Sequence, residues 1–230
     1  MDSRKNELLA EVIHCYVREA EPVGSRALEG ALGVSSATIR NEMAELESEG
    51  YLRQPYTSAG RVPTLKGYKF YIDNLLNINE PKPEEQGSLQ DIVKSYQNNH
   101  DIMLKNLAKT IAEFTGQATI VGFSPEDVYY TGLTNLFSQP EFSHIDMVIS
   151  MSRVIDHLAQ GMTKLYRKVD GIKKVEVCLG ESNPFGEDSA LLLTHCSTVR
   201  GHELIGILGP LRMDYDSNIG RLQYVRSILN

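Results

Sequence analysis

The sequence lacks the features that would assign it to an exported, membrane-spanning or disulfide-rich class. Its three cysteines, Cys15, Cys178 and Cys196, are scattered and form no C-x-x-C pair, which predicts a protein of the reducing cytoplasm. No run of about 18 apolar residues occurs, so we expect no membrane span. The opening residues MDSRKNE are too charged to begin a signal peptide. We therefore predict a cytoplasmic location and no membrane partner.

The motifs of common catalytic and metal sites are also missing. The sequence contains no G-x-S-x-G and no H-E-x-x-H. His195 and Cys196 are adjacent on a predicted strand, which directs their side chains to opposite faces and argues against a shared metal site. Glu181, Glu187 and Asp188 form an acidic cluster that is better explained as a solvated loop than as a catalytic pair. We predict no enzymatic activity, no cofactor and no metal.

An excess of positive charge is absent as well. The 230 residues carry a net charge of −7, which argues against a protein that coats nucleic acid without specificity. The distribution is uneven, however, because residues 51–70 hold Arg53, Arg61, Lys66 and Lys69 and no acid. With 41% hydrophobic and 23% charged residues, the composition is typical of a globular protein, long enough for a small domain and a larger one.

The first 76 residues have the pattern of four helices and a hairpin. Apolar residues recur at helical spacing, and glycine, serine and proline mark the breaks. Helices are predicted at 8–17, 26–32, 35–50 and 65–76, with two short strands within 52–63. Gly33 is expected to end the second helix, and Ser35 or Ser36 to cap the third. A helix, a short turn and a second helix form the arrangement that presents one helix to the DNA major groove.

The start of the third predicted helix and the hairpin carry side chains suited to DNA. Hydroxyl, amide and guanidinium groups at a helix N-terminus can contact base edges, and free N–H groups there can bind a phosphate. A basic hairpin with small residues can lie against the sugar–phosphate chain. The acids Glu42, Glu45, Glu47 and Glu49 should face away from DNA. The predicted DNA-binding residues are Ser25, Ser35, Ser36, Thr38, Arg40, Asn41, Ser58, Arg61, Lys66 and Lys69. The alternative is that these residues are helix caps and solvated side chains.

The rest of the chain is predicted as a linker, 77–87, and an α+β domain, 88–230. A long helix is expected at 88–114, a strand at 118–122, a strand or strand-turn at 129–137, and helix at 142–169. Strands at 175–180, 190–198 and 202–208 precede a final helix at 217–229. Gly206–Pro210 lacks the lysine of a phosphate loop and is interpreted as a tight turn.

Several segments resemble the heat-inducible transcription repressor family (HrcA-like). In the first 76 residues they are PVGS at 22–25, LGVSSATIRNEM at 32–43, LESEGYL at 46–52 and QPYTSAGRVPT at 54–64 with Gly67-Tyr68. In the second domain they are TGLTNLF at 131–137 with QPEF at 139–142, and GILGPLRMDY at 206–215. The resemblance covers nearly the whole chain.

The resemblance implies a winged helix-turn-helix domain followed by a GAF-like α+β domain. It implies a dimeric repressor that binds an inverted-repeat operator upstream of chaperone operons, with a GroEL-type chaperonin supporting its active state. Members of the family are usually longer, and we place the missing stretch between Phe123 and Val128, where a dimerisation domain would be inserted. Two alternatives remain open. One is a winged-helix regulator whose second domain senses a small ligand, and the other is an enzyme or scaffold that uses the helix-turn-helix for protein contacts.

Overall fold

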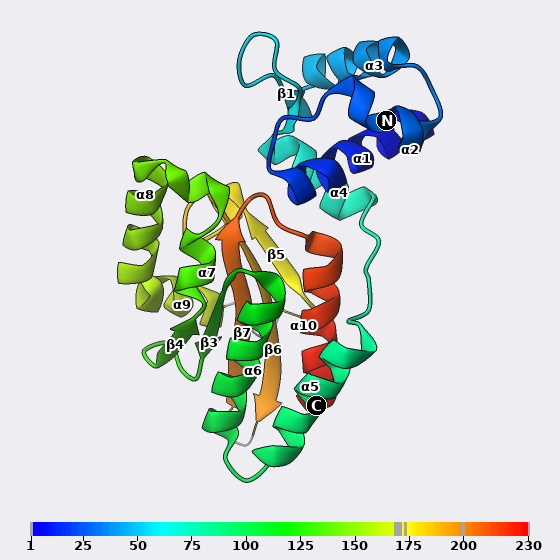
Figure 1. Cartoon of the computed structure of the whole chain (residues 1–230). Helices are drawn as coiled ribbons and strands as arrows, with labels where there is room; N and C mark the ends of the chain where they lie inside the picture. The colour runs from blue at the N-terminus through cyan, green and yellow to red at the C-terminus, as the bar shows by residue number, and fades with distance from the viewer. Residues whose placement is uncertain (1, 168–171, 173, 199–200, 230) are drawn as a thin grey trace. The chain divides into compact units, whose positions relative to one another are not determined.

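Two units make up the computed structural model, which describes residues 2–167, 172, 174–198 and 201–229 (Figure 1). Unit 1 comprises Met1–Asn77 together with Leu211–Asp214, and unit 2 comprises Ile78–Pro210 and Tyr215–Asn230. In the four-residue segment of unit 1, Arg212 Nη1 donates a hydrogen bond to the carbonyl of Val17 at 2.7 Å. No helix within the described ranges is both long enough and apolar enough to cross a membrane.

Unit 1 contains short helices and one small hairpin, as the sequence predicts. Its elements are α1 (Ser3–Glu19), the 3-10 helix η1 (Ser25–Leu28), α2 (Glu29–Leu32), α3 (Ser36–Ser48), β1 (Leu52–Arg53), β2 (Val62–Pro63) and α4 (Leu65–Asn74). The side chains of Asp2, Ser35 and Thr64 accept backbone N–H bonds at the starts of α1, α3 and α4, which fixes where these helices begin. Gly33 ends α2 with a left-handed φ of 66°, so its predicted role is confirmed.

The hairpin of unit 1 is held by a third segment as well as by its own two strands. Leu52 pairs with Pro63 and Arg53 with Val62, while Val23 forms an isolated bridge with Arg61. This bridge requires a close approach of the chain at Gly60, where a Cβ atom would lie 2.4 Å from the Val23 carbonyl oxygen. Only glycine fits there without displacing the backbone.

Unit 2 is a five-stranded antiparallel sheet with helices. Its elements are α5 (Pro83–Ser95), α6 (His100–Thr115), β3 (Ala118–Gly122), β4 (Val128–Thr131), α7 (Leu133–Phe137), η2 (Pro140–Ser143), α8 (Ile145–Asp156), α9 (Leu158–Tyr166), β5 (Glu176–Leu179), η4 (Gly180–Ser182), β6 (Ser189–Thr198), β7 (Gly201–Pro210) and α10 (Tyr215–Leu229). The strand order is β4-β3-β7-β6-β5, so β4 and β5 are the edges. The architecture is therefore mixed helix and sheet, as predicted.

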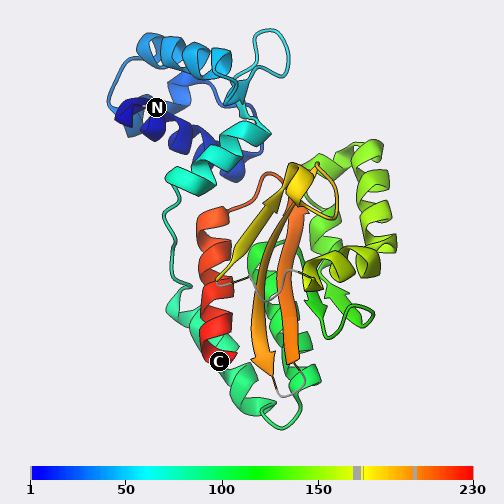
Figure 2. The same ribbon diagram turned by 180° about the vertical axis from the view of Figure 1, so that it is seen from behind.

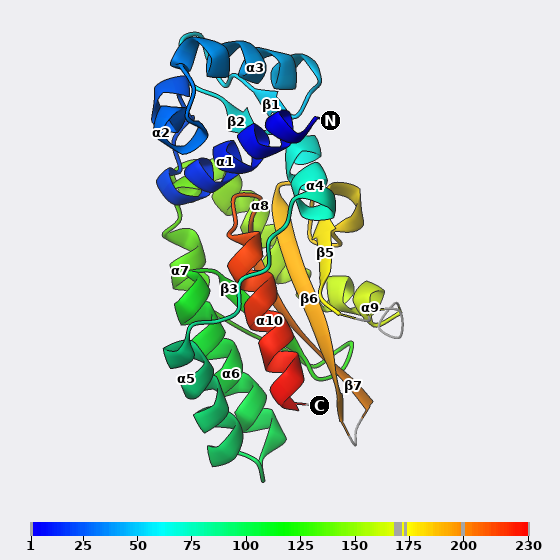
Figure 3. The same ribbon diagram turned by 90° about the vertical axis from the view of Figure 1, so that its right-hand side faces the viewer.

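Helices cover both faces of this sheet. Helices α5, α6 and α10 pack together, and α6 and α10 pack on the strands (Figure 3). In the reverse view the strands β5, β6 and β7 lie in front of α6 (Figure 2). The opposite side of the sheet packs on α7, α8 and α9 through a cluster that includes Leu136, Met151, Met162, Leu193 and Leu204.

Four predicted elements of unit 2 differ from the structure in part or in whole. The helix expected at 88–114 is two helices, because Asn99 accepts the Ile102 N–H at 3.2 Å and starts α6 afresh. Helix α5 also begins at Pro83, inside the predicted linker. The helix expected at 142–169 is η2, α8 and α9, interrupted where His157 ends α8. Its last predicted residues, Lys168 and Val169, lie outside the described residues.

The other two differences concern strands. The segment 129–137 is a strand followed by the short helix α7, with Gly132 at φ 80° between them. Gly206–Pro210 is not a tight turn, because these residues continue β7 and pair with β6. In contrast, the predicted strand at 118–122 is confirmed as β3.

Candidate nucleic-acid interface

Helix α3 presents a polar outer face. Ile39, Met43 and Leu46 are buried, as predicted from their spacing. The exposed residues include Thr38, Arg40 and Asn41 near the beginning of the helix, together with Ser35 before it; Ser36 is partly exposed. Among the described residues Arg40 forms no ion pair.

The N-terminus of α3 differs from the phosphate site that the sequence predicts. The N–H of Ser36 donates to Glu29 Oε1 at 2.7 Å, and the N–H of Thr38 donates to Ser35 Oγ at 3.4 Å. Bonds from the Ser36 hydroxyl and its N–H keep the pKa of the Glu29 carboxyl below its usual range. The helix dipole therefore already has an anion of this chain at its positive end, and the N–H groups of Ser36 and Thr38, which were expected to be free, are bonded within the chain.

Three acids on and just after α3 are paired with cations of α1. Arg4 forms an ion pair with Glu42. The Lys5 ammonium lies 2.8 Å from Glu49 and 2.9 Å from Glu45. The hydrogen bonds that the Lys5 ammonium donates to Glu49 and then to Glu45 raise the pKa of Lys5. These contacts place three acids of the helix against cationic side chains of its neighbour and reduce the negative charge that DNA would meet.

The loop of the hairpin is held by internal hydrogen bonds and is exposed at its tip. Tyr56, at the tip, is 66% exposed. The N–H of Ala59 donates to the Tyr56 carbonyl at 3.0 Å, and Gln54 Nε2 donates to the Ala59 carbonyl at 3.0 Å. Ser58, predicted to bind DNA, is exposed and has a left-handed φ of 68°.

Arg61 is the most enclosed of the predicted arginines. Its side chain is 17% exposed, and its Nε lies 2.8 Å from Glu47 Oε2. The backbone of Arg61 exchanges two hydrogen bonds with Val23, each 2.9 Å long. The Arg61 guanidinium therefore already has partners within the chain. The residues next to Arg61 in the sequence do not indicate this pairing.

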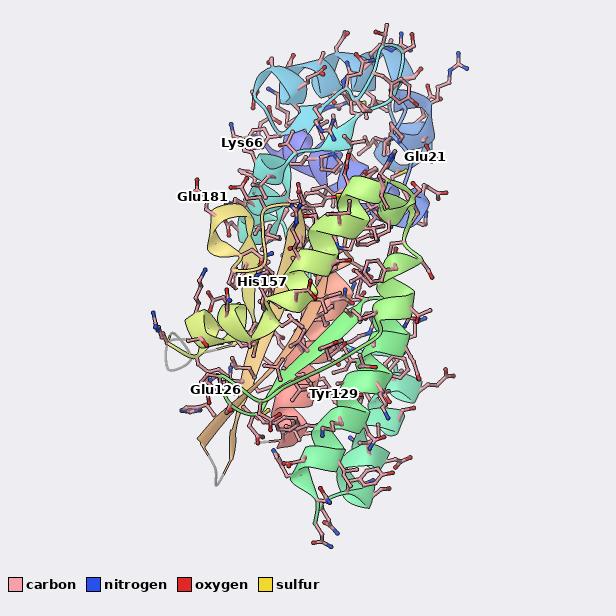
Figure 4. All side chains as sticks on the ribbon, turned by 90° about the vertical axis from the view of Figure 1, so that its left-hand side faces the viewer. Glu21, Lys66, Glu126, Tyr129, His157 and Glu181 are labelled. Atoms are coloured by element: carbon pink, nitrogen blue, oxygen red, sulfur yellow. The ribbon has the colours of Figure 1, made fainter. Side chains whose placement is uncertain are left out.

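Three further predicted residues differ in environment. Ser25 begins η1 and is only 9% exposed, so little of it reaches a large ligand. Lys66, labelled in Figure 4, donates to the Glu49 carbonyl at 2.6 Å and lies 4.4 Å from the centre of the Tyr51 ring. A cation at this position caps the C-terminus of α3, which gives Lys66 a structural contact. Lys69 is exposed on α4.

A hollow of about 360 Å³ lies between α3 and the hairpin. Its polar lining comes from Ser25, Arg40, Gln54, Ser58 and Arg61. The structure thus brings together five side chains from three segments, four of which the sequence predicts as DNA contacts. Gln54 is the one that the sequence analysis does not predict as a DNA contact, although its position beside the predicted loop would have indicated it.

Unit 2 buries several polar side chains in and around its sheet. Glu203 is 1% exposed and forms an ion pair with His100 at the start of α6. Cys196 is paired with Glu203 across β6 and β7, while the ring of His195 packs edge-on against that of His202 at 4.9 Å. Burial, and secondarily the Glu203 charge, raises the pKa of the Cys196 thiol to about 12. His195 and Cys196 therefore point apart, as strand alternation predicts.

Candidate ligand sites in unit 2 are few. No group of three or more His, Cys, Asp or Glu side chains within the described residues could hold a metal ion. A hollow of about 590 Å³ lies beside α9, β5 and the segment 180–187, with Lys164, Cys178 and Glu181 among its lining. Its lining mixes cationic, acidic and apolar groups and indicates no single ligand class.

Comparison with known proteins places the chain in a family. The model of the HrcA protein C terminal domain matches residues 76–219. The heat-inducible transcription repressor HrcA of Acetivibrio thermocellus is 45% identical over 122 residues, 52% of this chain and 35% of the relative. The protein of the same name from Thermoanaerobacter sp. is 44% identical over 124 residues, again 35% of its length. This chain therefore matches about a third of the length of these two relatives.

One relative aligns from end to end. The heat-inducible transcription repressor HrcA of Ruminiclostridium cellulolyticum is 25% identical over 336 positions, covering 100% of this chain and 97% of the relative. The alignment is about a hundred positions longer than the 230 residues of this chain, so the chain is the shorter one, as predicted.

A solved structure shares the fold. The crystal structure of a hypothetical protein at 2.2 Å resolution gives a TM-score of 0.68 at 16% identity and covers 99% of both chains. Its likeness extends to the fold alone. Because the HrcA family model covers more than half of the residues, this chain belongs to the HrcA family, whose similar members are named heat-inducible transcription repressors.

Proposed function

We propose that this chain is a sequence-specific DNA-binding repressor of heat-shock operons, with unit 1 as a winged helix-turn-helix domain. The observation that carries the proposal is the outer face of α3. Arg40, Thr38 and Asn41 are exposed there, next to the basic hairpin, while three of the four acids along and just after the helix are paired with α1. This distribution leaves a cationic and polar surface on a protein whose net charge is −7.

In this proposal α3 enters the major groove and the hairpin lies along the backbone. An α-helix fits the major groove, where the residues at its beginning reach base edges. The hollow between Arg40 and the hairpin would receive a backbone phosphate, with Ser58 as a neighbouring donor. Ser25 and Lys66 would contribute least, since one is buried and the other caps α3.

The proposal includes a cytoplasmic homodimer on an inverted repeat, with unit 2 as a GAF-like domain that holds the two copies together. Two-fold symmetry in a protein matches two-fold symmetry in its operator. Support for a GroEL-type chaperonin as a partner comes from the family alone. Light scattering at micromolar concentration should give the mass of two chains, and a monomer would contradict this part.

The DNA-binding proposal is tested with the full chain and fluorescent promoter fragments. The fragments are its own promoter and a chaperonin-operon promoter, each with and without chaperonin. Arg40→Ala should weaken operator binding about 5- to 150-fold, the range of one lost base contact. Arg61→Ala should weaken it too. Arg18→Ala is the matched control, because Arg18 is exposed on α1 and paired with Glu19.

Two results would contradict the proposal at different levels. Unchanged affinity in both the Arg40 and the Arg61 variants would reject the assigned interface. Absence of salt-dependent binding to any promoter fragment would reject DNA binding itself, because contacts to phosphates make affinity fall with salt.

A second candidate is a winged-helix regulator that senses a small ligand. The observation in its favour is the 590 Å³ hollow of unit 2, which falls within the range of small-molecule sites. Mass spectrometry of the purified native chain would detect a retained ligand. A ligand lost from a folded Cys178→Phe variant, whose larger side chain would narrow the hollow, would support this candidate over chaperone control.

A further inference from the structure

The hairpin of unit 1 needs an anchor beyond its own strands. Each strand is two residues long, and isolated hairpins are marginal even when they are longer. The backbone bridge to Val23 supports the hairpin where β2 begins. A contact between a side chain of α3 and the loop would also fix the position of the loop relative to that helix.

The Glu47 carboxylate provides such a contact with both of its oxygens. Oε1 accepts the backbone N–H of Gln54 at 2.9 Å, just after β1. Oε2 lies 2.8 Å from Arg61 Nε, just before β2. One side chain of α3 therefore holds both legs of the loop at the points where they leave the strands.

The two residues that Glu47 contacts, Gln54 and Arg61, both donate hydrogen bonds to one carbonyl oxygen of the loop. Gln54 Nε2 donates to the Ala59 carbonyl at 3.0 Å, and Arg61 Nη1 donates to the same oxygen at 3.5 Å. The Glu47 side chain is 34% exposed and that of Arg61 17%, so this network is less screened than an ordinary surface pair.

We infer that Glu47 is a positioning residue that sets the spacing between the hairpin and α3. The inference rests on the proposed function where it concerns DNA. In a two-part interface, a base-reading helix and a backbone-reading hairpin must meet the duplex in register, so the spacing between them determines which sequence fits. Glu47 thereby favours operator over other DNA, although its own charge would oppose any DNA.

Glu49 offers a matched comparison on the same helix. It carries the same charge two residues later and pairs with Lys5 of α1, not with the loop. If Glu47 acted only by repelling phosphates, removing either carboxylate would have the same effect. If it positions the hairpin, only its own removal loosens the loop.

The first experiment measures the loop without DNA. The chain has no tryptophan, so Tyr56→Trp places a single fluorophore at the exposed hairpin tip. In this background Glu47→Ala should add a fast nanosecond component to the anisotropy decay. Glu47→Gln, which keeps an acceptor for Gln54, should add a smaller one, and Glu49→Gln none. Circular dichroism checks that each variant is folded, and Glu47→Gln decides the result if the alanine variant is not. A decay unchanged from the parent in the folded variants would overturn the inference.

The second experiment measures specificity in the chain with native Tyr56. Glu47→Ala should reduce the ratio of operator to non-operator affinity about fivefold or more, with the salt slope unchanged because no phosphate-binding cation is lost. Glu49→Gln should raise both affinities alike. Equal gains on both DNAs from Glu47→Ala would overturn the specificity role. If the parent chain bound no DNA, the proposed function would fail, while the anisotropy result would still decide whether Glu47 holds the loop.

Discussion

The two units differ in how deeply some of their charged side chains are paired. In unit 1 several ion pairs lie at the surface, such as those that join Lys5 to Glu45 and Glu49. In unit 2 an ion pair lies inside, where Glu203 is 1% exposed beside His100. Exposed pairs contribute little to folding but shape the field that a ligand meets. A buried pair contributes nothing to that field, yet breaking it is costly. If the proposed function is right, the surface pairs of unit 1 shape the field that DNA meets, whereas the buried pair of unit 2 serves the fold.

The strongest test of this contrast removes the partner of the buried acid. His100→Ala leaves the Glu203 carboxylate desolvated without its imidazole, and should destabilise the chain by about 3 kcal/mol. Urea unfolding followed by circular dichroism measures the loss. Adding Glu203→Gln should restore most of it, because the unpaired charge is then gone. Wild-type stability of His100→Ala would show that the pair is not structural.

A second ion pair of unit 2 should give a smaller, pH-dependent effect. Arg221 donates to Glu85 Oε1 at 2.7 Å from Nη2 and at 3.3 Å from Nε. Burial alone would raise the pKa of Glu85, but the bonds and charge of Arg221 outweigh burial and lower it. A lowered pKa stabilises the folded chain above the unfolded-state pKa of about 4.3, and this stability is lost as the pH falls through the folded pKa.

Arg221→Gln should therefore lower the free energy of unfolding by about 1 kcal/mol at neutral pH. Urea titrations between pH 7 and acid should show the difference from wild type shrinking below about pH 4. A difference that stays constant with pH would mean that the substitution acts through packing.

The smallest effect is expected from the surface pairs. Lys5→Ala exposes the charges of Glu45 and Glu49 near α3 and should lower operator affinity about twofold at low salt, with the loss shrinking as salt screens it. The unfolding midpoint should stay within error. Lys94→Ala is the control, since Lys94 is an exposed lysine of unit 2 that lies 4.0 Å from Asp91. A large drop in stability for Lys5→Ala would break the contrast between the units.

The features that the sequence predicts correctly depend on residues that are close together along the chain. Ser35 caps α3 and Gly33 ends α2 because each acts on atoms within four residues. The strand at 118–122 was found because a continuous apolar run marks a strand buried on both faces. The apolar face of α3 follows from periodicity alone.

What the sequence does not predict is set by residues far apart along the chain. The positive charge of Arg61 predicts a DNA contact. In the folded chain, however, the hairpin places Arg61 beside Glu47 and encloses its side chain. Glu29 reaches the N-terminus of α3 from the preceding helix. His100 and Glu203 are 103 residues apart and meet only because the sheet forms. The break at Asn99 was missed because the apolar period continues on both sides of it.

The turn between β3 and β4 is where we expect the segment present in longer members of this family to be inserted. Phe123 donates to the Asp127 carbonyl at 2.9 Å, and Ser124 Oγ accepts the Asp127 N–H at 3.0 Å, which closes the turn on itself. Its ends, Gly122 and Val128, are paired across the two strands at the edge of the sheet. Directly paired residues lie about 5 Å apart, so a folded module whose own ends are equally close can be spliced in here with the register of β3 intact. If the longer relatives carry their extra residues here, those residues could be gained or lost as one unit without disturbing the sheet.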